Sequence, residues 1–198
     1  MTGLDALDAA TWLNPPPAWD RTPEALTLET GEGTDFWRDT LYGFRRDSGH
    51  AFLVPVMGDF TAHVGFEGDY RALYDQAGLM LRQDDAHWIK AGIELSDGVA
   101  NLSVVVTRGA SDWSTLALGA EPGPQRLRMT RTGGAVVIQA RNAANHWQLL
   151  RVTPFPPGPA RVGPTACSPE RAGFSARFTE FTLGPAVAKA LHDESPAA

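Results

Sequence analysis

Four residues at alternating positions of the run WIKAGIE (88–94) could do chemistry together: Trp88, Lys90, Gly92 and Glu94. Strand side chains alternate between the two faces of a sheet, so these four share one face and the intervening apolar residues share the other. Lys90 and Glu94 lie about 13 Å apart along a strand, which is too far for a direct salt bridge. A cation and a carboxylate at this spacing can instead fix the hydroxyl groups of a ligand between them.

The preceding run, YDQAGLMLR (74–82), is expected to pair with this one across a polar turn over 83–87. Both apolar faces reach the core only if Leu81 lies opposite Ile89. The same register sets three pairs on the other face: Gly78 with Gly92, Gln76 with Glu94, and Met80 with Lys90. Two facing glycines remove two side chains from one place, which predicts a depression with a backbone floor. The alternative is that the glycines mark a bulge or a tight bend of the sheet, and that the charges are simply solvated.

The next run, LSVVVT (102–107), follows an SDG turn and extends the same face. We expect three of its residues on this face: Ser103 beside Glu94, Val105 beside Gly92, and Thr107 beside Lys90. Arg151 ends the run WQLLR and is expected to pair with a carboxylate from Glu94, Asp112 or Asp35. The predicted ligand-binding set combines polar contacts, the glycine gap and aromatic platforms: Tyr74, Gln76, Gly78, Trp88, Lys90, Gly92, Glu94, Asp112, Trp113 and Arg151.

Many short strands must position these residues, because turn signals recur every 8 to 15 residues without helical periodicity. This pattern indicates an all-β sandwich or barrel. We expect strands near 26–30, 36–45, 51–56, 59–67, 73–82, 87–95, 101–108, 113–118, 125–131, 134–140, 146–152 and 174–183. The segment 153–169 contains six prolines and is predicted to be a long loop. The chain forms one domain over 1–198, with its core at about 12–183 and a tail over 184–198 that is a short helix or a frayed end.

The composition excludes several classes of partner. The chain has 198 residues, 43% hydrophobic content and a formal net charge of −6, with no cluster of Lys or Arg. Neither nucleic acid nor a membrane is therefore an expected partner. No segment approaches the roughly 18 apolar residues of a membrane helix, and the N-terminal segment lacks the features of a signal peptide, so we expect a cytoplasmic location. The five histidines and single cysteine show no metal-site spacing, and no nucleotide or hydrolase motif is present, so neither a metal nor a cofactor is expected.

A succession of short motifs resembles one known family. These are DFW (35–37), YDQAGL (74–79), WIKAGIE (88–94), LSVVVT (102–107), SDWS (111–114), WQLLR (147–151) and GFSARFTEF (173–181). Their order is similar to that of the regulation-of-enolase-protein-1-like family, a domain of unknown function in the concanavalin A-like lectin/glucanase superfamily. The resemblance covers about residues 12–183. It implies a jelly-roll β-sandwich of two antiparallel sheets, one of them concave, and it implies no reaction.

Three functions remain open. The first is non-catalytic binding of a carbohydrate or another small molecule on the concave sheet, and the second is a regulatory interaction with another protein. The third is a carbohydrate-active enzyme, either a lyase or a glycoside hydrolase, which needs two carboxylates about 5–9.5 Å apart. Glu94 has no second acid on its strand, so Asp35 or Asp112 would have to supply one. We therefore expect binding rather than catalysis.

Overall fold

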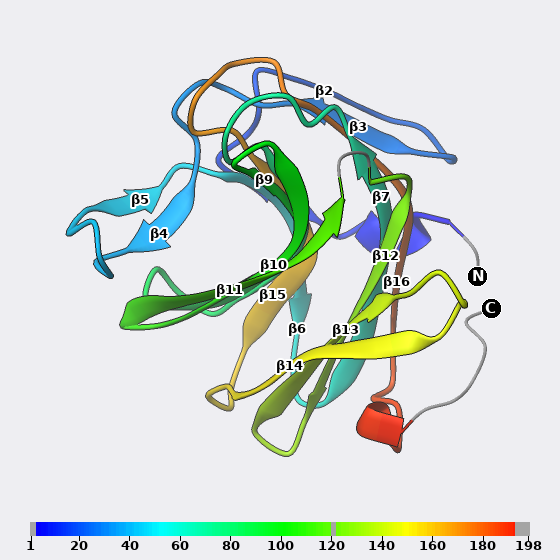
Figure 1. Cartoon of the computed structure of the whole chain (residues 1–198). Coiled ribbons are helices and arrows are strands. Elements are labelled where there is room, and N and C mark those ends of the chain that lie inside the picture. The colour runs from blue at the N-terminus through cyan, green and yellow to red at the C-terminus, as the bar shows by residue number, and fades with distance from the viewer. Residues whose placement is uncertain (1–2, 120–121, 193–198) are drawn as a thin grey trace.

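The computed structural model describes residues 3–119 and 122–192, and almost all of its regular structure is β-strand (Figure 1). The strands are β1 (Thr11–Leu13), β2 (Ala18–Arg21), β3 (Leu26–Glu29), β4 (Phe36–Arg38), β5 (Arg45–Asp47), β6 (His50–Val56), β7 (Phe60–Gly68), β8 (Gln76–Arg82), β9 (His87–Ser96), β10 (Val99–Arg108), β11 (Ala110–Gly119), β12 (Gln125–Thr132), β13 (Ala135–Arg141), β14 (Trp147–Pro154), β15 (Ala160–Cys167) and β16 (Ser175–Gly184). Two 3-10 turns, η1 (Asp5–Leu7) and η2 (Ala190–His192), lie near the ends of the described chain.

Two seven-stranded antiparallel sheets pack face to face (Figure 1). The first, sheet A, has the order β1-β6-β15-β8-β9-β10-β11, and the second, sheet B, has the order β14-β13-β12-β7-β16-β3-β2. The inward-facing apolar residues of both sheets form one continuous core. The all-β jelly-roll sandwich predicted from the sequence is confirmed.

The predicted register of β8 and β9 is confirmed at every pair. Leu81 lies opposite Ile89, and Gly78 lies opposite Gly92. The register of β10 differs from the prediction by two residues, because Ser103, Val105 and Thr107 lie opposite Gly92, Lys90 and Trp88. Ser96 pairs with Val99, so the connection is a two-residue turn whose residues, Asp97 and Gly98, both have positive φ. This is the geometry of a tight type I′ hairpin, and the shorter connection shifts the register of β10 against β9 by two residues from the predicted one.

The loop predicted over 153–169 is wrong in its second half. β15 lies in the middle of sheet A, between β6 and β8, although it contains Pro164. Its ladder with β6 is interrupted between Val162 and Thr165, while Pro164 still pairs with Leu79 on the β8 side. The missing N–H of the proline therefore falls where the ladder is already broken, which is how a central strand can tolerate it. The short strands β1 and β2 were also not predicted.

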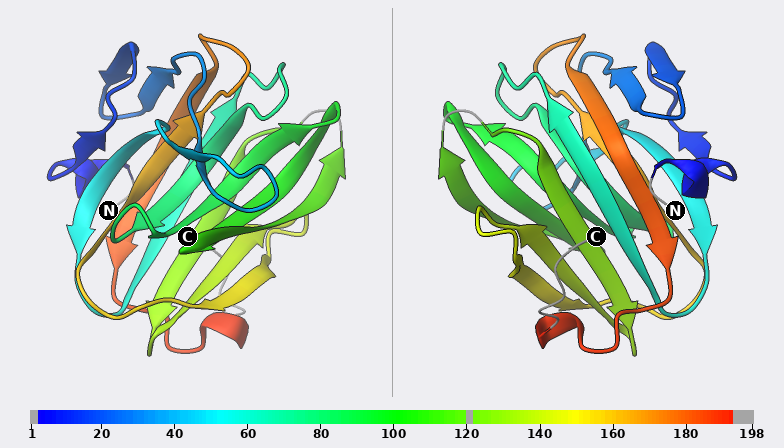
Figure 2. Two further views of the ribbon diagram at one scale, coloured as in Figure 1. Left: turned by 90° about the vertical axis from the view of Figure 1, so that its left-hand side faces the viewer. Right: turned by 90° about the vertical axis from the view of Figure 1, so that its right-hand side faces the viewer.

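A separate two-stranded hairpin, β4–β5, replaces the single strand predicted over 36–45. The positive φ angles of Asp39, Leu41 and Gly43 turn the chain back between the two strands. The hairpin crosses the outer face of sheet A, as Figure 2 shows in its left view. Phe36 and Trp37 pack there against Met80, Trp88, Val105 and neighbouring apolar residues in a second, smaller core. The face predicted to be open to solvent is thus covered over part of its area.

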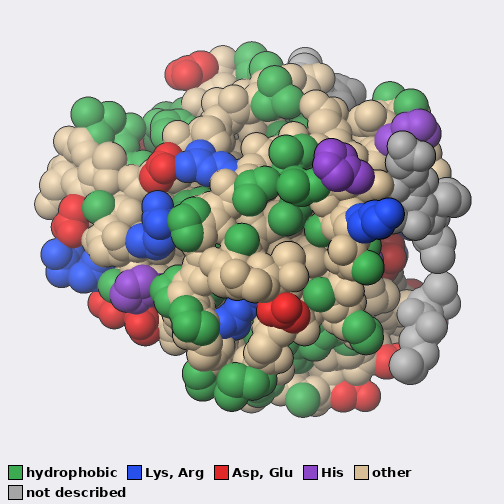
Figure 3. All heavy atoms as spheres, turned by 90° about the horizontal axis from the view of Figure 1, so that it is seen from below, with side chains coloured by type: hydrophobic (Ala, Val, Ile, Leu, Met, Phe, Trp, Pro, Cys, Tyr) green, Lys and Arg blue, Asp and Glu red, His purple; other side chains and the backbone are tan. Residues whose placement is uncertain are grey.

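The face of the molecule seen from below is mixed in character (Figure 3). The face seen in Figure 3 carries acidic and basic side chains beside one another, between apolar ones. In the described ranges, no helix is long and apolar enough to cross a membrane. Of the predicted tail, η2 is a short helical turn, and residues 193–198 lie outside the described part of the chain.

Candidate ligand-binding site

A cavity of about 220 Å³ lies between the outer face of sheet A and the β4–β5 hairpin. Its floor comes from β8 to β11, its roof from the hairpin, and one wall from the loop after β15. The lining residues are Asp35, Trp37, Tyr42, Phe44, Arg46, Tyr74, Gln76, Lys90, Glu94, Val105, Trp113, Pro169 and Glu170.

The hairpin is fixed to sheet A at both ends of its ladder. The backbone N–H of Arg38 donates to Ser111 Oγ at 2.9 Å, and its side chain donates to the carbonyl of Gly109 at 2.9 Å. On the other strand, Arg82 forms two hydrogen bonds to the Asp47 carboxylate, of 2.7 and 2.8 Å. Bidentate pairs of this kind are among the more strongly oriented side-chain contacts. The roof of the cavity is therefore an anchored element of the fold.

The first polar group of the cavity centres on Asp35, at the start of the hairpin. Its Oδ1 accepts hydrogen bonds from Lys90 Nζ at 2.8 Å, Gln76 Nε2 at 3.3 Å and the backbone N–H of Phe36 at 2.8 Å. Burial of Lys90 opposes its charge, but the attraction of Asp35, with that of Cys167 and Glu94, raises the pKa of Lys90 above its ordinary value. Lys90 is therefore a cation, and it ties the hairpin to the sheet.

The second polar group centres on Glu94. Ser103 Oγ donates to Glu94 Oε2 at 2.9 Å, and the indole N–H of Trp113 donates to Ser103 Oγ at 2.9 Å. Burial raises the pKa of Glu94, and the attraction of Lys90 and the bond from Ser103 offset only part of this effect. Glu94 is thus held in place by β10 and β11 and is easier to protonate than an exposed glutamate.

Three buried side chains of these groups keep hydrogen-bonding capacity that nothing in the described ranges uses. Gln76, Lys90 and Glu94 are 7%, 7% and 5% exposed. Lys90 Nζ has three donors and one acceptor partner, while Gln76 Oε1 and Glu94 Oε1 have no donor partner among the described residues. The free oxygens of Gln76 and Glu94 face the cavity and are not sealed from solvent, because neither belongs to the fully buried side-chain atoms without a hydrogen-bond partner. An occupant of the cavity that both donates and accepts would satisfy them.

The facing glycines have a different role from the one predicted. A Cβ on Gly78 would lie 2.1 Å from the carbonyl oxygen of Ala91, and one on Gly92 would lie 2.0 Å from that of Ala77. Glycine is therefore required because the two backbones approach closely, a reason that differs from both the predicted depression and the bulge or tight bend. The space at the pair is only about 20 Å³, which is close to the room one water needs. It adjoins the larger cavity, with which it shares the lining residues Gln76, Lys90 and Glu94.

Aromatic rings form much of the wall. Trp113 lies edge-on to Trp37 at 6.3 Å between ring centroids and edge-on to Tyr74 at 6.2 Å. Tyr74 precedes β8 with a φ of 63°, which turns it out of the strand geometry predicted for it. A hydrogen bond with Tyr42, together with burial, raises the pKa of Tyr74 to about 12. The prediction that Trp88 is a platform is corrected, because Trp88 is 1% exposed and packs against Phe36 in the smaller core.

Two further predicted residues, Asp112 and Arg151, lie outside the cavity, as do Trp88 and the glycine pair. Asp112 pairs with Arg151 NH2, and Arg151 NH1 also donates to Ser114 Oγ at 3.1 Å. Asp112 lies opposite Val106 on the core side of β11, whereas Trp113 faces the cavity from the outer side. The expected pairing of Arg151 with a carboxylate is confirmed, and its partner is the second of the three candidates. The pair joins the edges of the two sheets and does not fill the glycine gap.

The prediction omitted the residues that the hairpin and one loop contribute: Asp35, Trp37, Tyr42, Phe44, Arg46, Pro169 and Glu170. One signal in the sequence could have identified Asp35. A buried Lys90 needs an anionic partner, and the motif DFW places an acid directly before two aromatic residues that are expected to pack inside the protein. Asp35 also brings a second carboxylate to the cavity beside Glu94. Within residues 3–119 and 122–192, no group of three His, Cys, Asp or Glu side chains could hold a metal ion.

Comparison with known proteins gives consistent matches over nearly the whole chain. Residues 12–186 match the model of a family described as protein of unknown function, DUF1349. The chain is 50% identical over 190 residues, 96% of each chain, to "Regulation of enolase protein 1" of Saccharomyces cerevisiae. A solved structure of a functionally unknown protein from the same yeast aligns with a TM-score of 0.88 at 48% identity, covering 92% of this chain and 99% of the other.

More distant structures share the fold alone. The GH43 protein BlXynB of Bacillus licheniformis aligns with a TM-score of 0.68 at 20% identity, over 89% of this chain and 37% of that protein. A legume lectin-like domain from Entamoeba histolytica has the same sandwich.

Proposed function

The chain belongs to the DUF1349 family, and on that premise we propose that it binds a small hydroxylated ring, such as a sugar, in the cavity under the β4–β5 hairpin. The observation that carries the proposal is the unused hydrogen-bonding capacity of Gln76, Lys90 and Glu94 at three buried positions. Lys90 offers donors, while Gln76 and Glu94 offer acceptors. A hydroxyl group both donates and accepts, so neighbouring hydroxyls of one ring match this set.

The size and walls of the cavity support a single ring. Pockets for drug-sized ligands usually measure about 300–1,000 Å³, and this cavity measures about 220 Å³. The indole of Trp113 and the ring of Tyr74 present apolar surface beside the polar groups. Aromatic faces with polar groups at their edges suit the mixed surface of a sugar ring.

The fold is compatible with this proposal but does not establish it. Proteins named as a GH43 enzyme and as a legume lectin-like domain use the same sandwich. One fold supports many functions, so the argument depends on the cavity and its residues.

A panel of monosaccharides and sugar alcohols, screened by thermal shift and then by calorimetry, tests the proposal. We expect one or more members to bind, and Glu94→Gln to weaken that binding by about tenfold to a hundredfold, because hydrogen bonds to a charged group contribute about 1.5–3 kcal/mol. Asp112→Asn is the matched control, since Asp112 is an acid on the edge strand of the same sheet and lies outside the cavity. Binding by no member, or equal loss in both variants, would refute the proposal.

A regulatory interaction with another protein is the second candidate, and two observations favour it. The 50% identical yeast relative carries a regulatory name. The tip of the hairpin also exposes apolar surface, with Leu41 86% and Tyr42 48% exposed. Leu41→Ser should then abolish recovery of a stoichiometric partner in affinity purification from the source cells, whereas Leu191→Ser, at another exposed leucine, should not. Equal recovery with both variants would exclude the hairpin as the docking surface.

A further inference from the structure

Arg46 differs from every other charged residue of the hairpin segment 35–47. Asp35 pairs with Lys90, Arg38 with Asp85, Arg45 with Asp39, and Asp47 with Arg82. Arg46 has no carboxylate partner in the ranges that the structure describes, although it lines the cavity and is partly buried.

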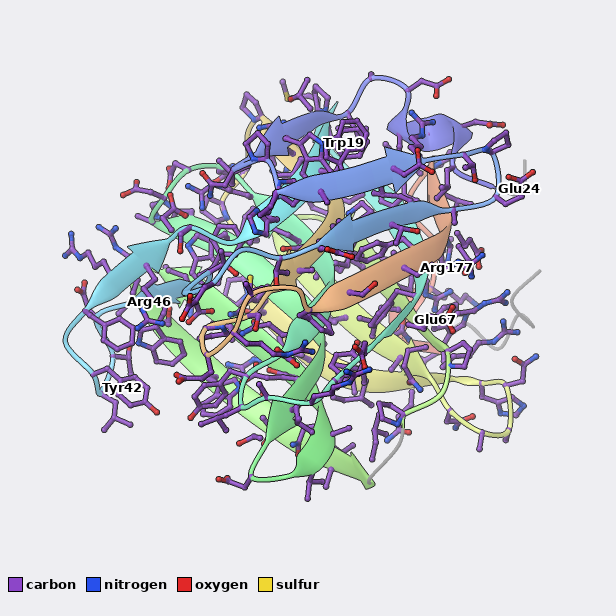
Figure 4. The ribbon with its side chains drawn as sticks, turned by 90° about the horizontal axis from the view of Figure 1, so that it is seen from above. Trp19, Glu24, Tyr42, Arg46, Glu67 and Arg177 are labelled. Carbon is purple, nitrogen blue, oxygen red and sulfur yellow. The ribbon has the colours of Figure 1, made fainter. Side chains whose placement is uncertain are left out.

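The side chain of Arg46 is nevertheless held in place. Its guanidinium lies 4.8 Å from the centroid of the Phe44 ring, and this ring stacks on Tyr42 at 5.4 Å. Residues 42, 44 and 46 therefore form one layer on the cavity side of the hairpin, and Figure 4 shows Tyr42 and Arg46 on this projecting element. Stacking on an aromatic ring leaves the in-plane N–H groups of a guanidinium free to bind an anion.

The other charges at the cavity define what it would accept. Lys90 is neutralised by Asp35, and Glu94 is the acid that holds Ser103. Glu170, on the loop after β15, is exposed, lines the same cavity, and has no ion-pair partner among the described residues. An anion at Arg46 would therefore gain the attraction of one unpaired guanidinium and feel the repulsion of Glu94 and Glu170, which line the same cavity.

We propose that the ligand of this cavity is a hydroxylated ring bearing one anionic group, a carboxylate or a phosphate, and that Arg46 binds this group. The proposal rests on the function proposed above and specifies the class of ligand for the same site. Gln76, Lys90 and Glu94 contact the hydroxyl groups at the floor, and Arg46 contacts the anion under the roof. Arginine suits this role because its planar fork matches both carboxylate and phosphate oxygens.

Calorimetric titrations with matched sugars test the assignment. The probes are the neutral, uronate and 6-phosphate forms of glucose, mannose and galactose, with inorganic phosphate as a control for the anion alone. We expect a uronate or a 6-phosphate to bind at least about tenfold more tightly than its neutral parent, the gain of one charge-assisted contact. The carboxylate and phosphate arms show which anion is preferred.

Two variants with opposite effects sharpen the test. Arg46→Gln should reduce the ratio of the affinities for the anionic and neutral forms to about one, while Glu170→Gln should strengthen binding of the anionic form. If neutral and anionic forms bind equally, or if Arg46→Gln leaves their ratio unchanged, the assignment is overturned and the proposed function stands. If no probe binds the wild-type protein, both the assignment and the proposed function fail.

Discussion

Replacing Lys90 by methionine removes the cation that neutralises Asp35 beneath the hairpin. The two side chains are 8% and 13% exposed and lie 2.8 Å apart. Removing one partner of a buried pair costs about 3–5 kcal/mol, because the remaining charge stays buried without a counter-charge. Asp35 keeps slight exposure and two other donors, so we expect about 3 kcal/mol for Lys90→Met. For a chain of this length, 1 kcal/mol shifts Tm by about 2–4 °C, which predicts a loss of about 6–12 °C.

A double-mutant cycle separates this pair from general damage. Asp35→Asn leaves Lys90 without its partner and should cost a similar amount, whereas Lys90→Met with Asp35→Asn removes both charges together. We expect the double variant to be more stable than the sum of the single losses predicts, by at least about 1 kcal/mol. Urea unfolding followed by tryptophan fluorescence gives the free energies of unfolding of all four proteins, and thermal unfolding followed by circular dichroism gives their Tm values. A Tm for Lys90→Met within 1 °C of wild type, or strictly additive losses, would refute a buried pair at this position.

Three further predictions concern the same region. Gly78→Ala should lower Tm by several degrees, because the added methyl group would clash with the backbone of β9 and overpacking costs about 1–3 kcal/mol. Gly184→Ala is the control and should not lower Tm, because a Cβ at Gly184 meets no atom within 4 Å. Equal effects of the two variants would contradict the close approach of β8 and β9 as the reason for glycine at position 78. Burial raises the pKa of Glu94 in the folded protein above its unfolded value of about 4.3, so the stability that its protonated form contributes is present below pH 4.3 and is lost as pH rises through the folded pKa. The free energy of unfolding of Glu94→Gln, relative to that of wild type, should therefore rise with pH above about 4.3. A difference between the two proteins that does not change with pH would contradict this. Burial raises the pKa of Cys167, so its thiol should be unreactive toward a disulfide reagent at pH 8 in the folded protein and react fully after unfolding; rapid reaction of the folded protein would contradict its burial.

The sequence predicted the parts of this structure that depend on local alternation and short turns. The pairing of Gly78 with Gly92 followed from placing both apolar faces on the core, and the structure has that register. The position of β15 could not be predicted in this way, because Pro164 argues against a central strand unless the interruption of the ladder with β6 is known. The two-residue turn after Ser96 likewise shifted β10 by two positions.

The candidate site was predicted only on its floor. Gln76, Lys90, Glu94 and Trp113 lie together in the cavity, because one strand face collects them. The roof depends on a contact between the hairpin and sheet A that is distant in sequence, since Asp35 and Lys90 are 55 positions apart. No periodicity in the chain encodes such a contact, so Trp88 was expected at the surface and is instead buried beneath Phe36.

The central proposal is that a hydroxylated ring binds between Trp113 and the hairpin, and indole N–H signals in a ¹H–¹⁵N NMR titration test it most directly. The chain has six tryptophans, of which Trp37 and Trp113 line the cavity. During titration with a sugar that binds, we predict saturable shifts of the Trp37 and Trp113 signals, with the signals of Trp19 and Trp147 unchanged. Saturable binding that moves Trp19 or Trp147 and leaves Trp37 and Trp113 in place would contradict the proposed site.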